Sequence, residues 1–122
     1  SRLAAVVGLQ DRISEAESLV RRCIALAEQE FGRQHPETAN HLEHLSSLLQ
    51  RQGRSAACEE LQREVLDIYE STYGSEHPLF AEALQRVAAV LHRLNRESDA
   101  NRLQDRATAI QGRSSHVLDD IL

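Results

Sequence analysis

The chain has 122 residues and a formal net charge of −5, and all 14 of its basic residues are arginine. The negative charge argues against a nucleic-acid partner, which usually meets a basic surface. No apolar run has the length needed to span a membrane, so neither nucleic acid nor membrane is expected as a partner.

Apolar residues at helical spacing predict a helical chain with short connections. The predicted helices span residues 1–9, 14–30, 36–52, 55–73, 78–94 and 97–111, with a turn expected at Gln10-Asp11. Most of them are followed by glycine or asparagine, the residues that adopt the left-handed conformation of a helix end most readily. These residues are Gly32, Gly53, Gly74 and Asn95.

One motif occurs twice, 42 positions apart: Phe31-Gly32-Arg33-Gln34-His35-Pro36 recurs as Tyr73-Gly74-Ser75-Glu76-His77-Pro78. The aromatic residue closes an apolar helix face, and the glycine ends the helix. The proline begins the next helix at the first position, where its missing N–H costs nothing, and the histidine stands where an N-cap belongs. We interpret the motif as a helix end followed by a helix start, in which both histidines are structural.

The same offset aligns apolar residues outside the motif. Examples are Leu42 with Leu84, Leu45 with Val87, and Leu49 with Leu91. Self-similarity at such a period is typical of a solenoid. We therefore predict a partial repeat (1–32), two full repeats (33–74 and 75–111) and a tail or short capping helix (112–122). The tail, with Val117, Leu118, Ile121 and Leu122 on one side, either covers the last helix pair, docks in a groove or frays.

Both cysteines align with small apolar residues of the other repeats. Cys23 aligns with Val65 and Ala107, and Cys58 aligns with Ala16 and Ala100. We therefore expect both thiols to be buried and reduced, which fits an intracellular, cytoplasmic protein.

The pattern of large and small residues resembles the tetratricopeptide repeat (TPR). Leu42, Leu45, Ser46 and Leu49 match its first helix, and Cys58 and Val65 match small positions of its second. The 42-residue period with its Phe/Tyr-Gly-x-x-His-Pro link is similar to the kinesin light chain-like branch. The resemblance implies an all-α, right-handed α-solenoid of antiparallel helix pairs with about two and a half repeats. Gln62 and Gln104 occupy a position that is usually large and apolar, which suggests a partly polar helix face.

In such a superhelix the first helix of each pair lines the concave groove. The resemblance implies that the groove is formed by Asn40, Glu43, Ser47, Gln50, Arg51, Glu82, Gln85, Ala89, His92 and Arg93. This polar surface suits a peptide that offers backbone hydrogen bonds and an acidic or amide side chain. We therefore expect a non-catalytic protein-protein interaction module or scaffold, with a protein or peptide as its partner.

A second hypothesis is a structural role through self-association. The partial repeat would leave an open helix face with Leu3, Val6 and Val7, which another copy of the chain could cover, giving a homo-oligomer.

Catalysis, metal binding and cofactors are not expected. His41 and His44 are three positions apart on one predicted helix, near His35, but a metal site needs more ligands in a rigid geometry. The carboxylates fall on predicted polar helix faces, where we expect them to be solvated, so no catalytic pair is predicted. These residues are Glu15, Glu17, Glu28, Glu30, Glu59, Glu60 and Glu64.

Overall fold

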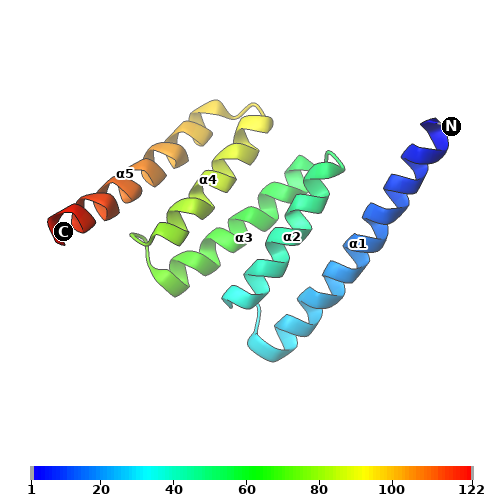
Figure 1. Ribbon diagram of the computed structural model, residues 1–122, viewed down its shortest axis with the longest axis horizontal. Coiled ribbons are helices and arrows are strands. Elements are labelled where there is room, and N and C mark those ends of the chain that lie inside the picture. Colours follow the sequence, from blue (N-terminus) through cyan, green and yellow to red (C-terminus); the bar gives the residue numbers. More distant parts are fainter. Residues whose placement is uncertain (1, 122) are drawn as a thin grey trace.

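The computed structural model describes residues 2–121, and it describes side chains for residues 12–113. Five helices follow one another: α1 (Arg2–Phe31), α2 (Pro36–Arg51), α3 (Ser55–Tyr73), α4 (Pro78–Arg93) and α5 (Glu97–Ile121). Each helix packs against its neighbour in the chain, so the helices stand in one row (Figure 1). The described residues contain no strand, and the predicted all-α solenoid of antiparallel helix pairs is confirmed.

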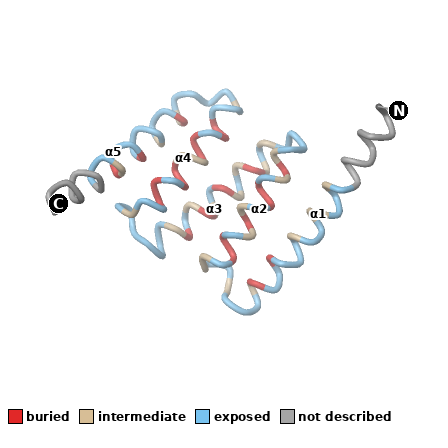
Figure 2. Tube along the Cα trace, viewed as in Figure 1, coloured by how far each residue is buried: buried red, intermediate tan, exposed pale blue. Residues whose placement is uncertain are grey.

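The core lies between neighbouring helices and is widest around α4. α4 has helices on both sides, and it is buried at every position from Phe80 to Leu91 except four. α1 has a neighbour on one side only, and along its described part only Ile24 and Ala27 are buried. Figure 2 shows this difference, with buried positions concentrated from α2 to α5 and sparse on α1. The array is therefore more tightly packed in its middle than at its α1 side.

The histidine of the repeated motif caps the following helix in both copies. The His35 Nδ1 accepts a hydrogen bond from the backbone N–H of Glu37, and the His77 Nδ1 accepts one from Leu79, both at 3.1 Å. Each histidine has extended backbone dihedrals, as an N-cap residue should. The structural role predicted for these two residues is confirmed.

Each capping ring also stacks on the aromatic residue that ends the preceding helix. The ring centroids are 4.7 Å apart for Phe31 and His35, and 4.8 Å apart for Tyr73 and His77. Between them, Gly32 and Gly74 have φ of 90° and 93°, which side chains rarely permit. The two copies of the motif therefore have equivalent surroundings.

The turn predicted at Gln10-Asp11 is wrong, because α1 continues without a break from Arg2 to Phe31. At the matching position of the other two repeats, φ is 75° at Gly53 and 62° at Asn95. Asp11 adopts such a conformation less readily than glycine, and the chain remains helical there. The open face predicted at Leu3, Val6 and Val7 lies outside the residues whose side chains are described.

The helix end predicted at Gln111 is also wrong, because α5 passes through Gly112 and continues to Ile121. A glycine inside a helix costs only about 1 kcal/mol relative to alanine, and no His-Pro pair follows it to start another helix. The residues assigned to one side of the tail (Val117, Leu118, Ile121 and Leu122) lie outside the described side chains.

One of the two predictions for the cysteines is wrong. Cys58 is buried, but Cys23 is exposed. The counterparts of Cys23 in the other repeats, Val65 and Ala107, are fully buried because a first helix packs over them. No helix of the described chain covers that side of α1, and Cys23 is therefore open to solvent.

Candidate functional site on α2 and α4

The residues predicted to line the groove lie on the first helices of the two full repeats, α2 and α4. Seven side chains are exposed: Asn40, Ser47, Arg51, Glu82, Ala89, His92 and Arg93. Three are half-buried: Glu43, Gln50 and Gln85. None belongs to the core, and their role in binding a partner stays a prediction.

Arg86 joins the two helices and lies between two of the predicted groove carboxylates. Its Nη1 lies 2.7 Å from Glu43 Oε1 on α2, and its Nη2 lies 3.8 Å from Glu82 Oε2 on its own helix. Burial and then the Glu43 charge raise the pKa of Tyr69 to about 12. Glu43 is therefore engaged within the protein. The sequence alone did not reveal Arg86 as its partner, because the repeat alignment pairs Arg86 with His44.

Two other predicted residues contact α5. The Gln85 Nε2 donates a hydrogen bond to Gln111 Oε1 at 3.3 Å, and His92 Nδ1 lies 2.6 Å from Glu97 Oε1. These contacts pair some of the polar side chains with others in the same chain. Fewer hydrogen-bonding groups are therefore left for a ligand than the sequence suggests.

Arg51 and Arg93 differ from the other charged residues of this surface. They occupy equivalent positions in the last turns of α2 and α4, where a positive charge complements the helix dipole. Both are exposed, and neither has an ion-pair partner among the side chains of residues 12–113. An acidic ligand could therefore bind either arginine without first displacing a described carboxylate.

A shallow pocket of about 290 Å³ adjoins Arg93 between α4 and α5. It is lined by Gln85, Ala88, Ala89, His92, Arg93, Glu97, Ala100, Asn101 and Gln104. The α5 wall of this pocket was not predicted from the sequence. The repeat offset contained the signal, since Gln104 aligns with Gln62, which contacts Ser46 on the preceding first helix.

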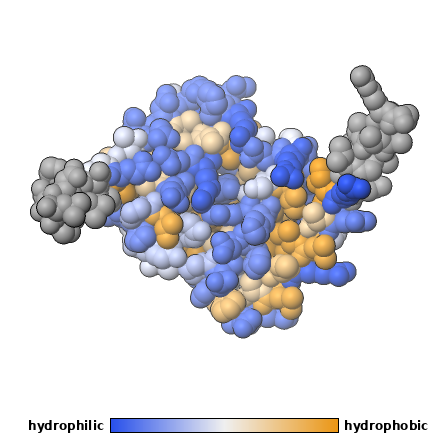
Figure 3. Space-filling view, in the orientation of Figure 1, coloured by the Kyte–Doolittle hydropathy of each residue, from blue (hydrophilic) through white to orange (hydrophobic). Residues whose placement is uncertain are grey.

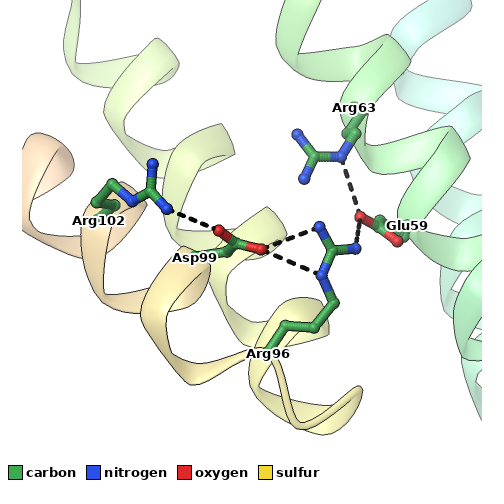
Figure 4. A network of polar contacts seen from close by, with 5 residues as sticks. All are labelled: Glu59, Arg63, Arg96, Asp99 and Arg102. Atoms are coloured by element: carbon green, nitrogen blue, oxygen red, sulfur yellow. Dashed lines mark hydrogen bonds and ion pairs between the residues drawn. The ribbon is translucent and has the colours of Figure 1, made fainter.

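On the second helices, ion pairs connect consecutive repeats. Glu59 on α3 accepts from Arg63 at 3.1 Å and from Arg96 at 2.7 Å. Arg96 also donates to Asp99, and Asp99 accepts from Arg102, each at 3.1 Å. Figure 4 shows Arg96 lying between the two carboxylates.

The core of this arrangement is repeated between α1 and α3, 42 positions earlier. Glu17 accepts from Arg21 at 3.0 Å and from Arg54 at 3.3 Å, and the hydrogen bond from Arg21 lowers the pKa of Glu17. The expectation that these carboxylates are simply solvated is therefore wrong for Glu17 and Glu59, whose side chains are only 18% and 15% exposed.

A second set of ion pairs also connects consecutive second helices, α1 with α3 and α3 with α5. The arginine of this set comes from a different repeat position at each of the two junctions. At the first junction Arg33, in the link after α1, bonds to Glu28 and to Glu64, and these carboxylates, Glu64 foremost, raise the pKa of Arg33. Glu28 and Glu64 are thus paired as well. At the second junction Glu70 is the counterpart of Glu28. It accepts hydrogen bonds from Ser75 Oγ at 3.3 Å and from Arg106 at 3.4 Å.

Within residues 12–113, no group of three or more His, Cys, Asp or Glu side chains is placed to hold a metal ion. The rings of His41 and His44 lie edge to face, with their centroids 6.3 Å apart. No helix of the described chain is both long and apolar enough to cross a bilayer.

Comparison with known proteins agrees with this geometry. A model of the tetratricopeptide repeat family matches residues 1–70 and 41–112. Among solved structures, a Podosopora anserina protein assigned as a kinesin light chain, with nearly identical TPR-like repeats, is 23% identical with a TM-score of 0.74, over 93% of this chain and 54% of that chain. BtubC (BKLC) from P. vanneervenii is 16% identical with a TM-score of 0.78, over 93% of this chain and 46% of that chain.

These two likenesses show the shared fold, and this chain spans about half the length of each structure. A comparison with curated proteins finds no significant match.

Proposed function

Because this chain belongs to the tetratricopeptide repeat family, we propose that it is a non-catalytic protein-protein interaction module that holds a partner segment against α2 and α4. The partner is a protein or peptide, and no cofactor takes part. The proposed setting is the cytoplasm. The two full repeats present equivalent surfaces side by side, as a scaffold for an extended ligand requires.

The observation that carries the proposal is the pair Arg51 and Arg93. Both are exposed, they are one repeat apart, and neither is paired with a described carboxylate. Glu43 and His92, by contrast, already have partners within the chain. The charge left for a ligand on this surface is therefore positive, although the chain as a whole is negative.

This charge favours a partner segment with two acidic or amide side chains, one for each arginine. Guanidinium groups bind carboxylates through paired, charge-assisted hydrogen bonds, which are stronger than neutral ones. Exposed Asn40, Ser47 and half-buried Gln50 supply neutral hydrogen-bonding groups for the backbone of the same segment.

Charge reversal at the arginines tests the proposal. Partners are first captured from a lysate with the unmodified chain and identified by mass spectrometry. We expect the variant Arg51→Glu with Arg93→Glu to lower recovery of the groove partners about tenfold or more, because each lost contact to a charged group is worth roughly 1.5–3 kcal/mol. Arg102→Glu is the matched control, because its side chain is 79% exposed on α5 and its ion pair is with Asp99, also on α5, and not with a residue of α2 or α4.

Equal recovery of every partner by the double variant and by the control would contradict groove binding. Circular dichroism of both variants, which keep the core intact, confirms that any loss of binding does not come from unfolding.

Self-association is the second candidate function, and one observation favours it. On α1, Leu19 and Leu26 are 60% and 64% exposed, although both belong to a helical apolar pattern. An apolar helix side of this kind is a docking surface for another helix. Light scattering at several concentrations separates the two functions. A chain that stays monomeric at every concentration can still bind a partner in the groove, but it does not self-associate.

A further inference from the structure

An apolar row on α1 has no cover in the described structure. We call Ala16, Leu19, Cys23 and Leu26 the α1 stripe. Its two leucines and Cys23 are exposed, and Ala16 is half-buried. Figure 3 shows hydrophobic residues at the surface along α1 and toward α2.

The other two repeats show what this position normally packs against. The counterparts of Leu26 are Ile68 and Ile110, with 0% and 1% exposure, and the counterparts of Cys23 are Val65 and Ala107, both at 0%. In those repeats α2 packs along α3, and α4 packs along α5, each pair being antiparallel. The α1 stripe therefore has the chemistry of a surface that receives an antiparallel helix.

We propose that the α1 stripe of a second copy of this chain is that antiparallel helix, so that two chains form a symmetric dimer. The dimer rests on the self-association candidate above and gives it a defined geometry. It does not involve the groove of α2 and α4.

The spacing of the stripe supports a helix-to-helix contact. With Arg12 before it and Glu30 after it, the row occupies positions 12, 16, 19, 23, 26 and 30. Residues that are alternately four and three positions apart line up along one side of a helix, as they do in a two-stranded coiled coil.

The stripe is also complementary to itself in size when two copies run antiparallel about position 21. Leu26 then faces Ala16 of the second copy, and Leu19 faces Cys23 of the second copy, because the numbers of each pair add to 42. Each large residue meets a smaller one, an alternation that allows two helices to approach closely.

The ends of the seam are complementary in charge. In the same register Arg12 faces Glu30 of the second copy, and the symmetry makes this pair twice. Both residues are exposed, and neither has an ion-pair partner among the described side chains. A parallel arrangement would instead place like charges opposite each other at both ends.

One residue opposes the dimer and gives a further test. Arg22 is exposed on the flank of the stripe near its middle, so the symmetry brings two positive charges near the axis. Arg22→Gln should therefore tighten the dimer, with a fall of about threefold or more in its dissociation constant.

Disulfide trapping tests the register. In Leu19→Cys, the new thiol faces Cys23 of the second copy, and we expect a covalent dimer on mild oxidation. A bridge within one helix is disfavoured, because side chains four apart have Cβ atoms about 5–6 Å from each other, farther than a disulfide spans. The matched control is Ala25→Cys, an exposed position on the pocket toward α2, where we expect the chain to stay monomeric on a non-reducing gel.

Charge exchange tests the orientation by sedimentation equilibrium of the full chain. Arg12→Glu or Glu30→Arg alone should raise the dimer dissociation constant about tenfold, since each places two like-charge pairs in the seam. The two changes together should restore it to within about threefold, which a merely structural effect would not do.

The outcomes separate the geometry from the self-association itself. If the chain is a monomer at every concentration, both the self-association and the antiparallel geometry are wrong, even if a different protein covers the α1 stripe. A dimer that Leu19→Cys fails to trap, or that the double charge exchange fails to restore, would overturn the antiparallel register alone. Neither result bears on the groove, which is tested by the Arg51 and Arg93 variants.

Discussion

Gln62 and Gln104 are the same residue at the same repeat position, yet their surroundings differ. Gln62 is 7% exposed; its Nε2 donates to Ser46 Oγ at 2.6 Å, and its Oε1 is buried without a partner. Gln104 is exposed on the pocket beside α4. The sequence predicted a partly polar face for both. Only Gln62 is buried, and burial makes its unpaired oxygen costly.

We expect Gln62→Leu to stabilise the protein by about 1 kcal/mol, because it removes a buried acceptor that has no hydrogen bond. Ser46 loses little, since its hydroxyl still donates to the Glu43 carbonyl oxygen at 2.8 Å. Urea unfolding followed by circular dichroism measures the change, and Gln104→Leu is the control that should alter stability far less. A loss of stability in Gln62→Leu would mean that its bond to Ser46 outweighs the unpaired oxygen.

At the scale of single residues, roles that depend on local sequence were predictable, and roles that depend on packing were not. The caps at His35 and His77 follow from the residues beside them, and both are confirmed. The contact of Arg86 with Glu43 depends on how α4 lies against α2, which the sequence pattern does not specify.

At the scale of the elements, ion pairs between second helices supplement the apolar contacts of the row. The same trio of one carboxylate and two guanidinium groups links α1 to α3 and α3 to α5. In each trio one arginine comes from the carboxylate's own helix and the other from the start of the next second helix. The shared carboxylate is thus the point at which consecutive repeats are tied.

Glu59→Gln should lower the free energy of unfolding by about 0.5–1 kcal/mol, because it removes the charge that Arg63 and Arg96 share. The loss should shrink at high salt, which screens partly exposed pairs. Urea unfolding at two salt concentrations measures it. The control is Glu60→Gln, an exposed neighbour on the same helix. A loss equal to that of the control, or one insensitive to salt, would show that the pairs add nothing.

The helices themselves were largely predictable, and the two errors have different causes. At Gln10-Asp11 the 42-residue period required a helix end, but Asp11 stands where Gly53 and Asn95 have positive φ. After Gln111 a glycine suggested a helix end, but no His-Pro pair follows Gly112 to start another helix. Helix propensity then prevailed over the pattern of the other repeats, giving a longer α1 and α5. Periodicity specifies which faces pack, whereas a helix end depends on the residues around it, and a glycine alone is not enough, as Gly112 shows.

At the scale of the whole molecule, the array is unequal from one side to the other. The backbone of α4 packs against both α3 and α5, while that of α1 packs against α2, and ion pairs add contacts from α1 to α3. In a linear array each repeat contacts only its neighbouring repeats, so local stability should follow the number of helices packed against each element.

Hydrogen exchange should therefore be graded along the chain. At concentrations low enough to prevent self-association, we expect amide protons of residues 12–31 in α1 to exchange about tenfold faster or more than those of α4. Mass spectrometry of proteolytic peptides gives the rates, with α3 as an internal reference of intermediate packing. Equal protection in α1 and α4 would mean that the array opens only as one cooperative unit.

For the candidate site, the sequence predicted which residues are outside the core but not which of them are available. Position within the repeat was enough to place Asn40, Ser47 and Arg93 at the surface. It did not show that Glu43 and Gln85 are engaged by Arg86 and Gln111, because those contacts join separate helices.

The ion pairs at the junctions decide which repeat could be copied in tandem. If residues 33–74 followed themselves, Arg54 of the second copy would meet Glu59 of the first, and Arg33 would meet Glu70, so both sets of charges would be complete. If residues 75–116, the matching 42 residues, followed themselves, Arg96 of the second copy would meet Asn101 of the first, which carries no charge. Only residues 33–74 contain both partners of the ion pairs that join consecutive repeats. A solenoid extended by design should therefore repeat that unit.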